Sequence, residues 1–279
     1  MSATFVQSQS THLMLGGKSI EVAIHSVPSP TNTILLLHEA LGSVSYWRDF
    51  PQRLAQETGS RVLLYSRPGH GSSQGPPERR SKEHYLRQVQ DVIPEILRHF
   101  SVESPILYGH SEGSGIAVLY SVISNQAKAL ILESPHVVPE RSTYLHIEKM
   151  AAEYPGSKLQ QRLARYHLEA DAVFHAWTKW ASTMDKNSYP LRDMLAHIHC
   201  PVLALQGAND DFGTTAHLDA LQTSIPHMEF EIYPDTGHLP HRERTDLVLS
   251  RVARFVGSLQ LSADLSHQPI QNFLFEKQA

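Results

Sequence analysis

The chain has 279 residues, of which 41% are hydrophobic and 19% are charged, and its formal net charge is -4. This composition is typical of a globular protein with a packed core, and it excludes the fibrous and disordered classes. Because the charge is slightly negative and no run of basic residues occurs, we expect neither nucleic acid nor a membrane surface as a partner.

No leader or membrane-spanning segment is expected. The first residues lack a basic region followed by an apolar stretch, and no apolar run approaches the ~20 residues that cross a bilayer. The one cysteine, Cys200, permits no intrachain disulfide. We therefore expect a soluble, cytoplasmic monomer or homodimer.

The first half of the chain alternates short apolar runs with amphipathic segments. Residues 12–27 alternate apolar and polar side chains around Gly16-Gly17, which predicts a β-hairpin. Further strands are expected to begin at Thr33, Arg61, Pro105 and Ala127, and helices are expected over 45–59, 84–100 and 116–125, with a kink at Pro94. Strands that alternate with helices predict a mostly parallel sheet.

The pattern changes between Pro135 and His199, where the spacing is helical and no run resembles a strand. We predict a helical insertion over 135–199 and a core domain made of 1–134 and 200–279. The second part of the core contains strands that begin at Pro201 and Met228 and helices over 214–225 and 245–259. Residues 262–279 show no clear periodicity.

Residues 109–113, Gly-His-Ser-Glu-Gly, match the pattern G-x-S-x-G where a strand meets a helix. In a nucleophile elbow the serine occupies this sharp turn, and the glycines let strand and helix approach closely. The alternative is a glycine-rich turn that only packs the two elements together. The context favours Ser111 as a nucleophile at the carboxyl end of the sheet, with His110 pointing away from the pocket.

A serine nucleophile needs a histidine as base and a carboxylate that orients the histidine. Asp210 lies in the loop after one late strand, and His238 lies just after the next strand. We expect Ser111, Asp210 and His238 to form a catalytic triad in this chain order. Asp211 and Glu133, the latter at the end of the strand before the insertion, are the alternative acids.

From about Thr11 to Leu259 the sequence resembles the α/β-hydrolase superfamily in its strands, elbow, late acid loop and late histidine. The resemblance implies an α/β protein with the α/β-hydrolase fold. Its features would be an eight-stranded, mostly parallel sheet flanked by helices, and a helical cap inserted after the sixth strand. The resemblance also implies hydrolysis of esters or related bonds by a Ser-His-Asp triad.

The same resemblance implies an oxyanion hole made of two backbone N–H groups. One belongs to Glu112, which follows the nucleophile. The other belongs to Ala40 in the loop 38–42, where Glu39 replaces the usual glycine of the family. We expect His38 and Glu39 to lie beside the nucleophile and to contact the substrate.

The insertion is expected to close over Ser111 and to determine specificity. Its candidates for lining the pocket are His136, Tyr166, His167 and Trp177, which suit a small acyl or aromatic ester. The alternative is that Tyr166 and Trp177 only pack the cap against the core.

No cofactor and no metal are expected. The histidine-rich segments 197–200 and 237–241 lack the ligand spacing of a zinc site. Residues 66–73, SRPGHGSS, lack the lysine and the glycine order of a nucleotide-binding loop. By its resemblance to a turn of the superfamily, this segment is interpreted as a tight turn behind the site.

The expected reaction is hydrolysis of a small carboxylic ester, or of a related acyl substrate, through an acyl-enzyme on Ser111. A serine argues against the branches of the superfamily that open epoxides or remove halogens with an aspartate. Two alternatives stay open: a hydrolase of carbon–carbon bonds in products of aromatic ring cleavage, and a ligand receptor with slow turnover on the same fold.

Overall fold

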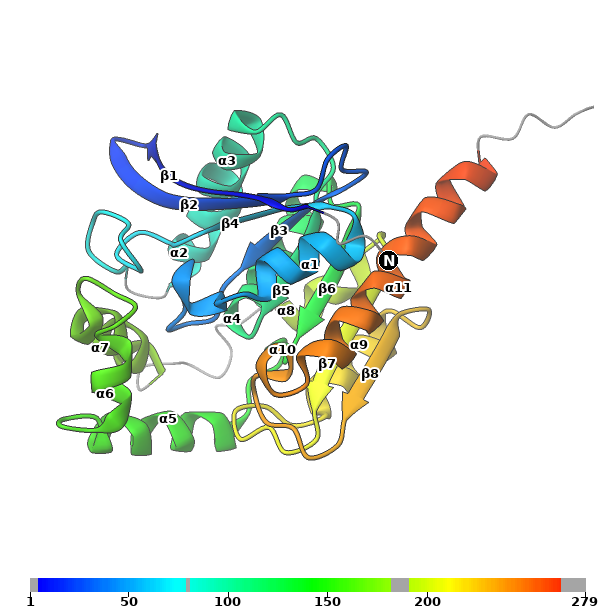
Figure 1. The fold of residues 1–279 in the computed structure, drawn as a ribbon. Coiled ribbons are helices and arrows are strands. Elements are labelled where there is room, and N and C mark those ends of the chain that lie inside the picture. Colours follow the sequence, from blue (N-terminus) through cyan, green and yellow to red (C-terminus); the bar gives the residue numbers. More distant parts are fainter. Residues whose placement is uncertain (1–4, 79–80, 182–190, 267–279) are drawn as a thin grey trace, which may run out of the picture.

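The computed structural model describes residues 5–78, 81–181 and 191–266, and its centre is one sheet of eight strands (Figure 1). The strand order is β1-β2-β4-β3-β5-β6-β7-β8. Strands β3 to β8 are parallel, whereas β2 is antiparallel to both β1 and β4. The strands are β1 (Gln7–Leu15), β2 (Lys18–Ser26), β3 (Thr33–Leu37), β4 (Arg61–Tyr65), β5 (Ile106–His110), β6 (Ala129–Glu133), β7 (Val202–Gly207) and β8 (Glu229–Tyr233). The expected fold class is confirmed.

Helices cover both faces of the sheet (Figure 1). One face packs against α1 (Phe50–Thr58) and α11 (Thr245–Ser266). The other face packs against α2 (Lys82–Arg87), α3 (Ile93–His99), α4 (Glu112–Ser124), α8 (Leu191–Met194) and α9 (Ala216–Ser224). Three short turns, η1 (Ser45–Trp47), η2 (Gln88–Val92) and η3 (Leu195–His197), and the short helix α10 (Pro240–Glu243) complete the core.

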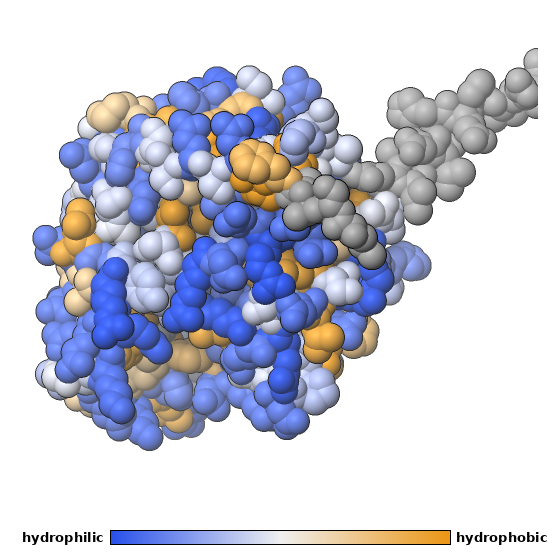
Figure 2. All heavy atoms as spheres, viewed as in Figure 1, coloured by the Kyte–Doolittle hydropathy of each residue, from blue (hydrophilic) through white to orange (hydrophobic). Residues whose placement is uncertain are grey.

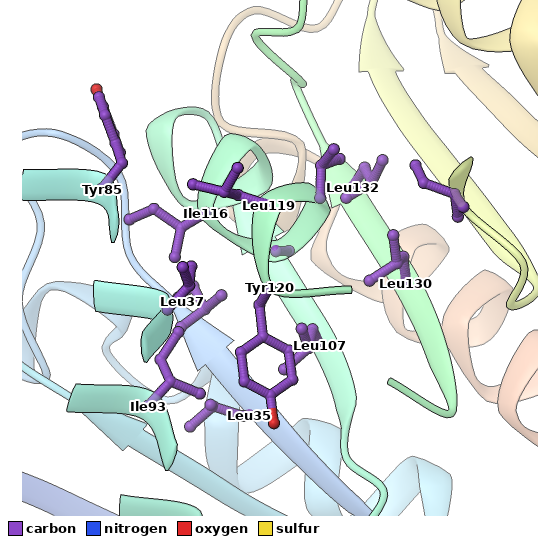
Figure 3. Close-up of a cluster of buried hydrophobic side chains, with 14 of the residues drawn as sticks. Leu35, Leu37, Tyr85, Ile93, Leu107, Ile116, Leu119, Tyr120, Leu130 and Leu132 are labelled. Carbon is purple, nitrogen blue, oxygen red and sulfur yellow. The ribbon is translucent and has the colours of Figure 1, made fainter. Parts of the chain in front are cut away.

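The hydrophobic core has two halves because side chains of a strand point alternately to the two faces of the sheet. On β3, Leu35 and Leu37 face α3 and α4, and Ile34 and Leu36 face α1 and α11. Figure 3 shows the first half, in which side chains of β3, β5 and β6 meet those of α2, α3 and α4. This two-sided burial accounts for the continuous apolar runs in the sequence.

Two helical predictions differ in detail from the structure. The kink expected at Pro94 takes the form of the π-helical turn η2 directly before α3, where Pro94 stands in the first turn. A wide turn accommodates the missing N–H and the bulk of a proline ring. The helix expected over 245–259 continues to Ser266, so that residues 262–266 are helical. Residues 267–279 lie outside the described residues.

The insertion after β6 is helical, as expected. It contains α5 (Arg141–Glu153), α6 (Lys158–Leu163) and α7 (Ala170–Ala181), which lie together at the lower left of Figure 1. These helices have a small core of their own around Ile147, Leu163, Phe174 and Trp177, and this core packs on Ala40 and Leu41 from the loop after β3. The insertion therefore rests directly on the loop that was expected to carry an oxyanion donor.

Hydrophilic side chains cover most of the molecular face in Figure 2, where hydrophobic ones form small, separate spots. Isolated apolar side chains such as Leu145 and Leu168 are exposed, which is ordinary for globular proteins. The apolar surface with a bearing on function is therefore the one beneath the cap helices.

Candidate active site

Ser111 occupies the sharp turn between β5 and α4. Its φ of 54° and ψ of -116° lie outside the regions that non-glycine residues ordinarily adopt. The flanking positions must be glycine, because a Cβ on Gly109 would lie 2.3 Å from the O atom of Gly113, and one on Gly113 would lie 2.0 Å from the O atom of Leu37. The strained turn thus presents Ser111 at the N-terminal end of α4.

Asp210 and His238 meet at the ends of the neighbouring strands β7 and β8. The His238 Nδ1 atom lies 2.9 Å from Oδ1 and 2.8 Å from Oδ2 of Asp210. The carboxylate is held in place by further donors, since Oδ1 accepts from the Phe212 N–H at 2.8 Å and Oδ2 accepts from Gln206 Nε2 at 2.9 Å. Asp210 is therefore fixed before any substrate arrives.

The surroundings of this pair determine its protonation. Burial is the largest single influence and lowers the pKa of His238, but the hydrogen bond and charge of Asp210 together with the charges of Glu39 and Glu133 raise it above its ordinary value. Burial raises the pKa of Asp210, but its contacts with His238 and with the Phe212 N–H depress it well below the usual range. An ionised carboxylate against Nδ1 keeps a proton on that nitrogen, so Nε2 is the nitrogen that can act as a base.

The alternative acids stand elsewhere. Asp211 is exposed to solvent. Glu133 is fully buried, and its carboxylate accepts hydrogen bonds from the Tyr108 hydroxyl at 2.9 Å and from the His241 N–H at 2.6 Å. Of the three acids weighed from the sequence, Asp210 is the one whose hydrogen bonds reach His238.

His110, the residue before the nucleophile, supports the backbone of His238. Its Nε2 atom donates to the carbonyl oxygen of His238 at 2.8 Å, and the Ser134 hydroxyl donates to the same oxygen at 3.2 Å. Burial is the main cause that lowers the pKa of His110, to about 3, so its ring is neutral at physiological pH. His110 was expected to point away from the pocket, and in the structure it forms a hydrogen bond within the protein interior.

The loop after β3 brings Ala40 to the same cavity as Ser111 and Glu112. The carboxylate of Glu39, which replaces the usual glycine, folds back so that Oε2 accepts the N–H of Leu41 at 2.8 Å. Glu112 is the first residue of α4, and its N–H points out of the N-terminal end of the helix. The departure at Glu39 thus stabilises the loop through a local hydrogen bond.

The Glu112 side chain, whose role was open from the sequence, is buried against Arg67. Its Oε2 atom lies 2.6 Å from Arg67 Nη2, and the Tyr85 hydroxyl donates to Oε1 at 3.0 Å. The sequence pattern of residues 66–73 predicts a turn and indicates no separate role for Arg67. The charge beside Ser111 is therefore neutralised by an arginine.

A cavity with about 1060 Å³ of empty space, including its open mouth, lies between the core and the cap helices. Its floor includes Ala40, Ser111, Glu112 and His238. The cap lines it with apolar side chains, among them Ile147, Met150, Leu159, Leu163 and Trp177. Of the predicted substrate contacts, Glu39, His136 and Trp177 line this cavity. The cavity is large enough for an apolar acyl or aryl group.

Three other predicted contacts, His38, Tyr166 and His167, are not among the described residues that line the cavity. His38 is buried behind the loop, where Nε2 accepts the Arg67 N–H at 3.1 Å. His167 accepts the Gly71 N–H at 3.0 Å and donates to the Leu41 carbonyl at 2.8 Å, so it fastens the cap to the core.

Tyr166 packs edge-on against Tyr46, with ring centroids 4.9 Å apart. His38, Tyr166 and His167, which were expected to contact the substrate, thus make contacts within the protein in this structure.

Within the described part of the chain, no group of three or more His, Cys, Asp or Glu side chains is arranged to hold a metal ion. Nor does any helix there combine the length and the hydropathy needed to cross a membrane.

Curated relatives match most of the chain at low identity. The sn-1-specific diacylglycerol lipase of Xenopus tropicalis is 25% identical over 262 residues, which cover 84% of this chain and 80% of the relative. A proline iminopeptidase of Lactobacillus helveticus is 24% identical over 257 residues, with 76% of this chain and 85% of the relative covered.

Solved structures share the fold. A carboxylesterase of Nitrososphaera gargenis superposes with a TM-score of 0.72 at 18% identity, covering 90% of this chain and 99% of the other. An esterase of Thermogutta terrifontis gives a TM-score of 0.69 at 20% identity, with the same coverage of 90% and 99%. The sequence model of the alpha/beta hydrolase family matches residues 34–251, which is well over half of the chain. The chain therefore belongs to the alpha/beta hydrolase family.

Proposed function

We propose that this hydrolase cleaves a carboxylic ester with a small apolar acyl or aryl group, through an acyl-enzyme on Ser111. The observation that carries the proposal is the hydrogen-bonded pair of Asp210 and His238 at the cavity that Ser111 lines from a strained elbow. A nucleophile, a base and an acid that orients the base are the minimum set for this chemistry.

In the proposed reaction the same groups act in two steps, the formation of the acyl-enzyme and its hydrolysis. Ser111 Oγ attacks the ester carbonyl while His238 Nε2 takes its proton, and Asp210 stabilises the imidazolium that forms. The N–H groups of Ala40 and Glu112 bind the oxyanion of the tetrahedral intermediate. His238 then protonates the departing alcohol, and water attacks the acyl-enzyme by the same route.

The walls of the cavity support an apolar substrate. Ile147, Leu163 and Trp177 from the cap and Phe212 from the acid loop form its apolar surface. Relatives described as a diacylglycerol lipase and as esterases favour an ester as the reactive bond. His136, which also lines the cavity, provides a polar contact for the alcohol or acyl part.

The nucleophile can be tested without knowledge of the substrate. Intact mass is measured after treatment with phenylmethylsulfonyl fluoride. We expect one sulfonyl adduct on the wild type and on the matched control Ser142→Ala, which removes an exposed hydroxyl of α5, and none on Ser111→Ala. A wild type that stays unmodified contradicts the assignment of Ser111.

The bond specificity is tested next with p-nitrophenyl esters of increasing acyl length beside a 2-hydroxy-6-oxo-dienoate. We expect multiple turnovers on short esters with an initial burst of p-nitrophenol. Turnover of the dienoate alone would assign carbon–carbon bond hydrolysis. Labelling of Ser111 with negligible turnover on every substrate would assign a ligand receptor.

A further inference from the structure

The guanidinium of Arg67, in the turn after β4, touches both segments that carry the proposed oxyanion donors. Arg67 is 1% exposed. Its Nη1 atom donates to the carbonyl of His38 at 2.8 Å, and its Nη2 atom donates to the carbonyl of Glu39 at 2.9 Å and to Glu112 Oε2 at 2.6 Å. One planar group thus spans the loop after β3 and the start of α4.

On the loop side, these contacts fix the peptide group that carries the Ala40 N–H. The Glu39 carbonyl also accepts from His38 Nδ1 at 2.7 Å and from the Gly42 N–H at 3.1 Å. In a planar trans peptide the N–H points opposite to the carbonyl, so donors that hold the Glu39 oxygen also direct the Ala40 N–H. Hydrogen bonds to that oxygen polarise the peptide and make its N–H a better donor.

On the helix side, Arg67 and Tyr85 hold the carboxylate of the residue that supplies the second N–H. Glu112 follows Ser111 directly, and its side chain is buried between the Arg67 guanidinium and the Tyr85 hydroxyl. A side chain held at both oxygens leaves its own backbone little freedom. The position of the Glu112 N–H is therefore tied to the same guanidinium as that of Ala40.

We propose that Arg67 is a positioning residue for the oxyanion hole and sets the separation and the directions of its two N–H donors. The inference rests on the proposed serine hydrolase function. A buried ion pair alone adds little stability, because desolvation of both charges offsets their attraction. The planar fork of an arginine is required here, because a lysine ammonium cannot donate to two successive carbonyls and a carboxylate in this geometry.

The test compares Arg67→Lys and Glu112→Gln with the wild type on p-nitrophenyl butyrate and on an aryl trifluoromethyl ketone, whose serine adduct places an oxyanion in the hole. The matched control is Arg251→Lys, which alters another nearly buried arginine that pairs with Glu229 at 2.6 Å. Thermal melting is recorded for every variant.

For Arg67→Lys we expect kcat to fall about 10- to 100-fold, less than the loss of a whole oxyanion donor, while KM changes less than about threefold. The inhibition constant of the ketone should rise by the same factor as kcat/KM falls. For Glu112→Gln we expect a fall in kcat of about tenfold, because the arginine keeps its carbonyl contacts. Arg251→Lys should leave kcat unchanged.

A folded Arg67→Lys protein with wild-type kcat, or with its loss confined to KM, overturns the inference. If Arg67→Lys does not fold, Glu112→Gln decides in the same way, since unchanged kcat and ketone binding in that variant contradict the positioning role. A wild type that neither hydrolyses the ester nor is labelled at Ser111 refutes the proposed function as well. Normal wild-type activity together with normal variants refutes only the role of Arg67.

Discussion

Two histidines, His238 and His241, lie three residues apart on the segment after β8. Each is hydrogen-bonded to a carboxylate, and the two pairs have almost the same geometry. His238 Nδ1 lies 2.8 Å from Asp210 Oδ2, and His241 Nδ1 lies 3.0 Å from Glu133 Oε1. The difference lies in access. The His238 side chain is 15% exposed and lines the cavity, whereas that of His241 is 1% exposed and packs against Trp47 and Phe50.

The two histidines are therefore oriented in the same way and differ in their access to the cavity. Both pairs supply a carboxylate that fixes a histidine ring. Of the two histidines, His238 lines the cavity together with Ser111, so we expect its ring, and not that of His241, to exchange a proton with a substrate. The second pair joins β6 to the segment after β8 and is expected to contribute stability.

The largest difference between the two histidine–carboxylate pairs is expected in kcat. Asp210→Asn should lower kcat on a p-nitrophenyl ester about 10⁴-fold, because an amide no longer stabilises the imidazolium and favours the wrong tautomer. The matched variant Glu133→Gln should lower kcat less than about tenfold. Steady-state kinetics on folded samples provides the measurement, and equal losses in both variants would mean that the two pairs share the catalytic role.

For the free energy of unfolding, we expect the opposite order, with the larger loss in Glu133→Gln. Glu133→Gln should lower the free energy of unfolding by about 3 kcal/mol, because it leaves the fully buried His241 without its carboxylate. Asp210→Asn should cost less, because its partner His238 is partly exposed and lines the cavity. Chemical denaturation at pH 7 gives both values.

The free energy of unfolding at acidic pH provides a second test of the pair formed by Glu133 and His241. Burial raises the pKa of Glu133, but the attraction and hydrogen bonds of His241 lower it by more. The pKa is thus about 2, below the ordinary 4.5. The contribution of the ionised Glu133 to the free energy of unfolding is therefore present above pH 4.5 and is lost as the pH falls toward 2. If the free energy of unfolding of Glu133→Gln stayed below that of the wild type by the same amount down to pH 2, the loss would not come from the ionised carboxylate of Glu133.

The smallest expected effect is a shift in the pH profile. His238 must be neutral to act as a base, and its pKa lies above the ordinary 6.5 because Asp210, with the charges of Glu39 and Glu133, outweighs the effect of burial. The kcat/KM value should thus rise with pH to a half-maximum above 6.5 in the wild type and in Glu133→Gln alike. A midpoint below 6.5 would show that burial outweighs the influence of Asp210.

Local patterns were sufficient to predict the strands, the elbow and the loops that carry Asp210 and His238. Buried parallel strands leave continuous apolar runs, and a strained turn leaves glycines at fixed positions. These signals lie within a few neighbouring residues. The same reasoning placed Glu39, His136 and Trp177 near the nucleophile, and the structure has all three on the cavity wall.

Features that depend on distant partners could not be predicted in this way. The contacts of Arg67 with His38 and Glu112 join positions 29 and 45 residues apart, and nothing near Arg67 in the sequence indicates them. His38 and His167 were expected to meet the substrate, whereas in the structure their rings form hydrogen bonds with backbone groups. Residue type suggests a polar contact, but the direction in which a ring points depends on the packing of the whole loop.

The hydrogen bond from His110 to the backbone of His238 makes the serine and the histidine parts of one rigid frame, although 128 positions separate the bonded residues. His110 ends β5 and directly precedes Ser111, so a shift of this strand end carries both proposed reacting groups along together. The cap lies outside this frame, between β6 and β7. A cap of another length or composition could therefore be grafted at that junction to change the substrate range, as long as it reproduces the packing on Ala40 and Leu41, while Ser111 and His238 keep their alignment.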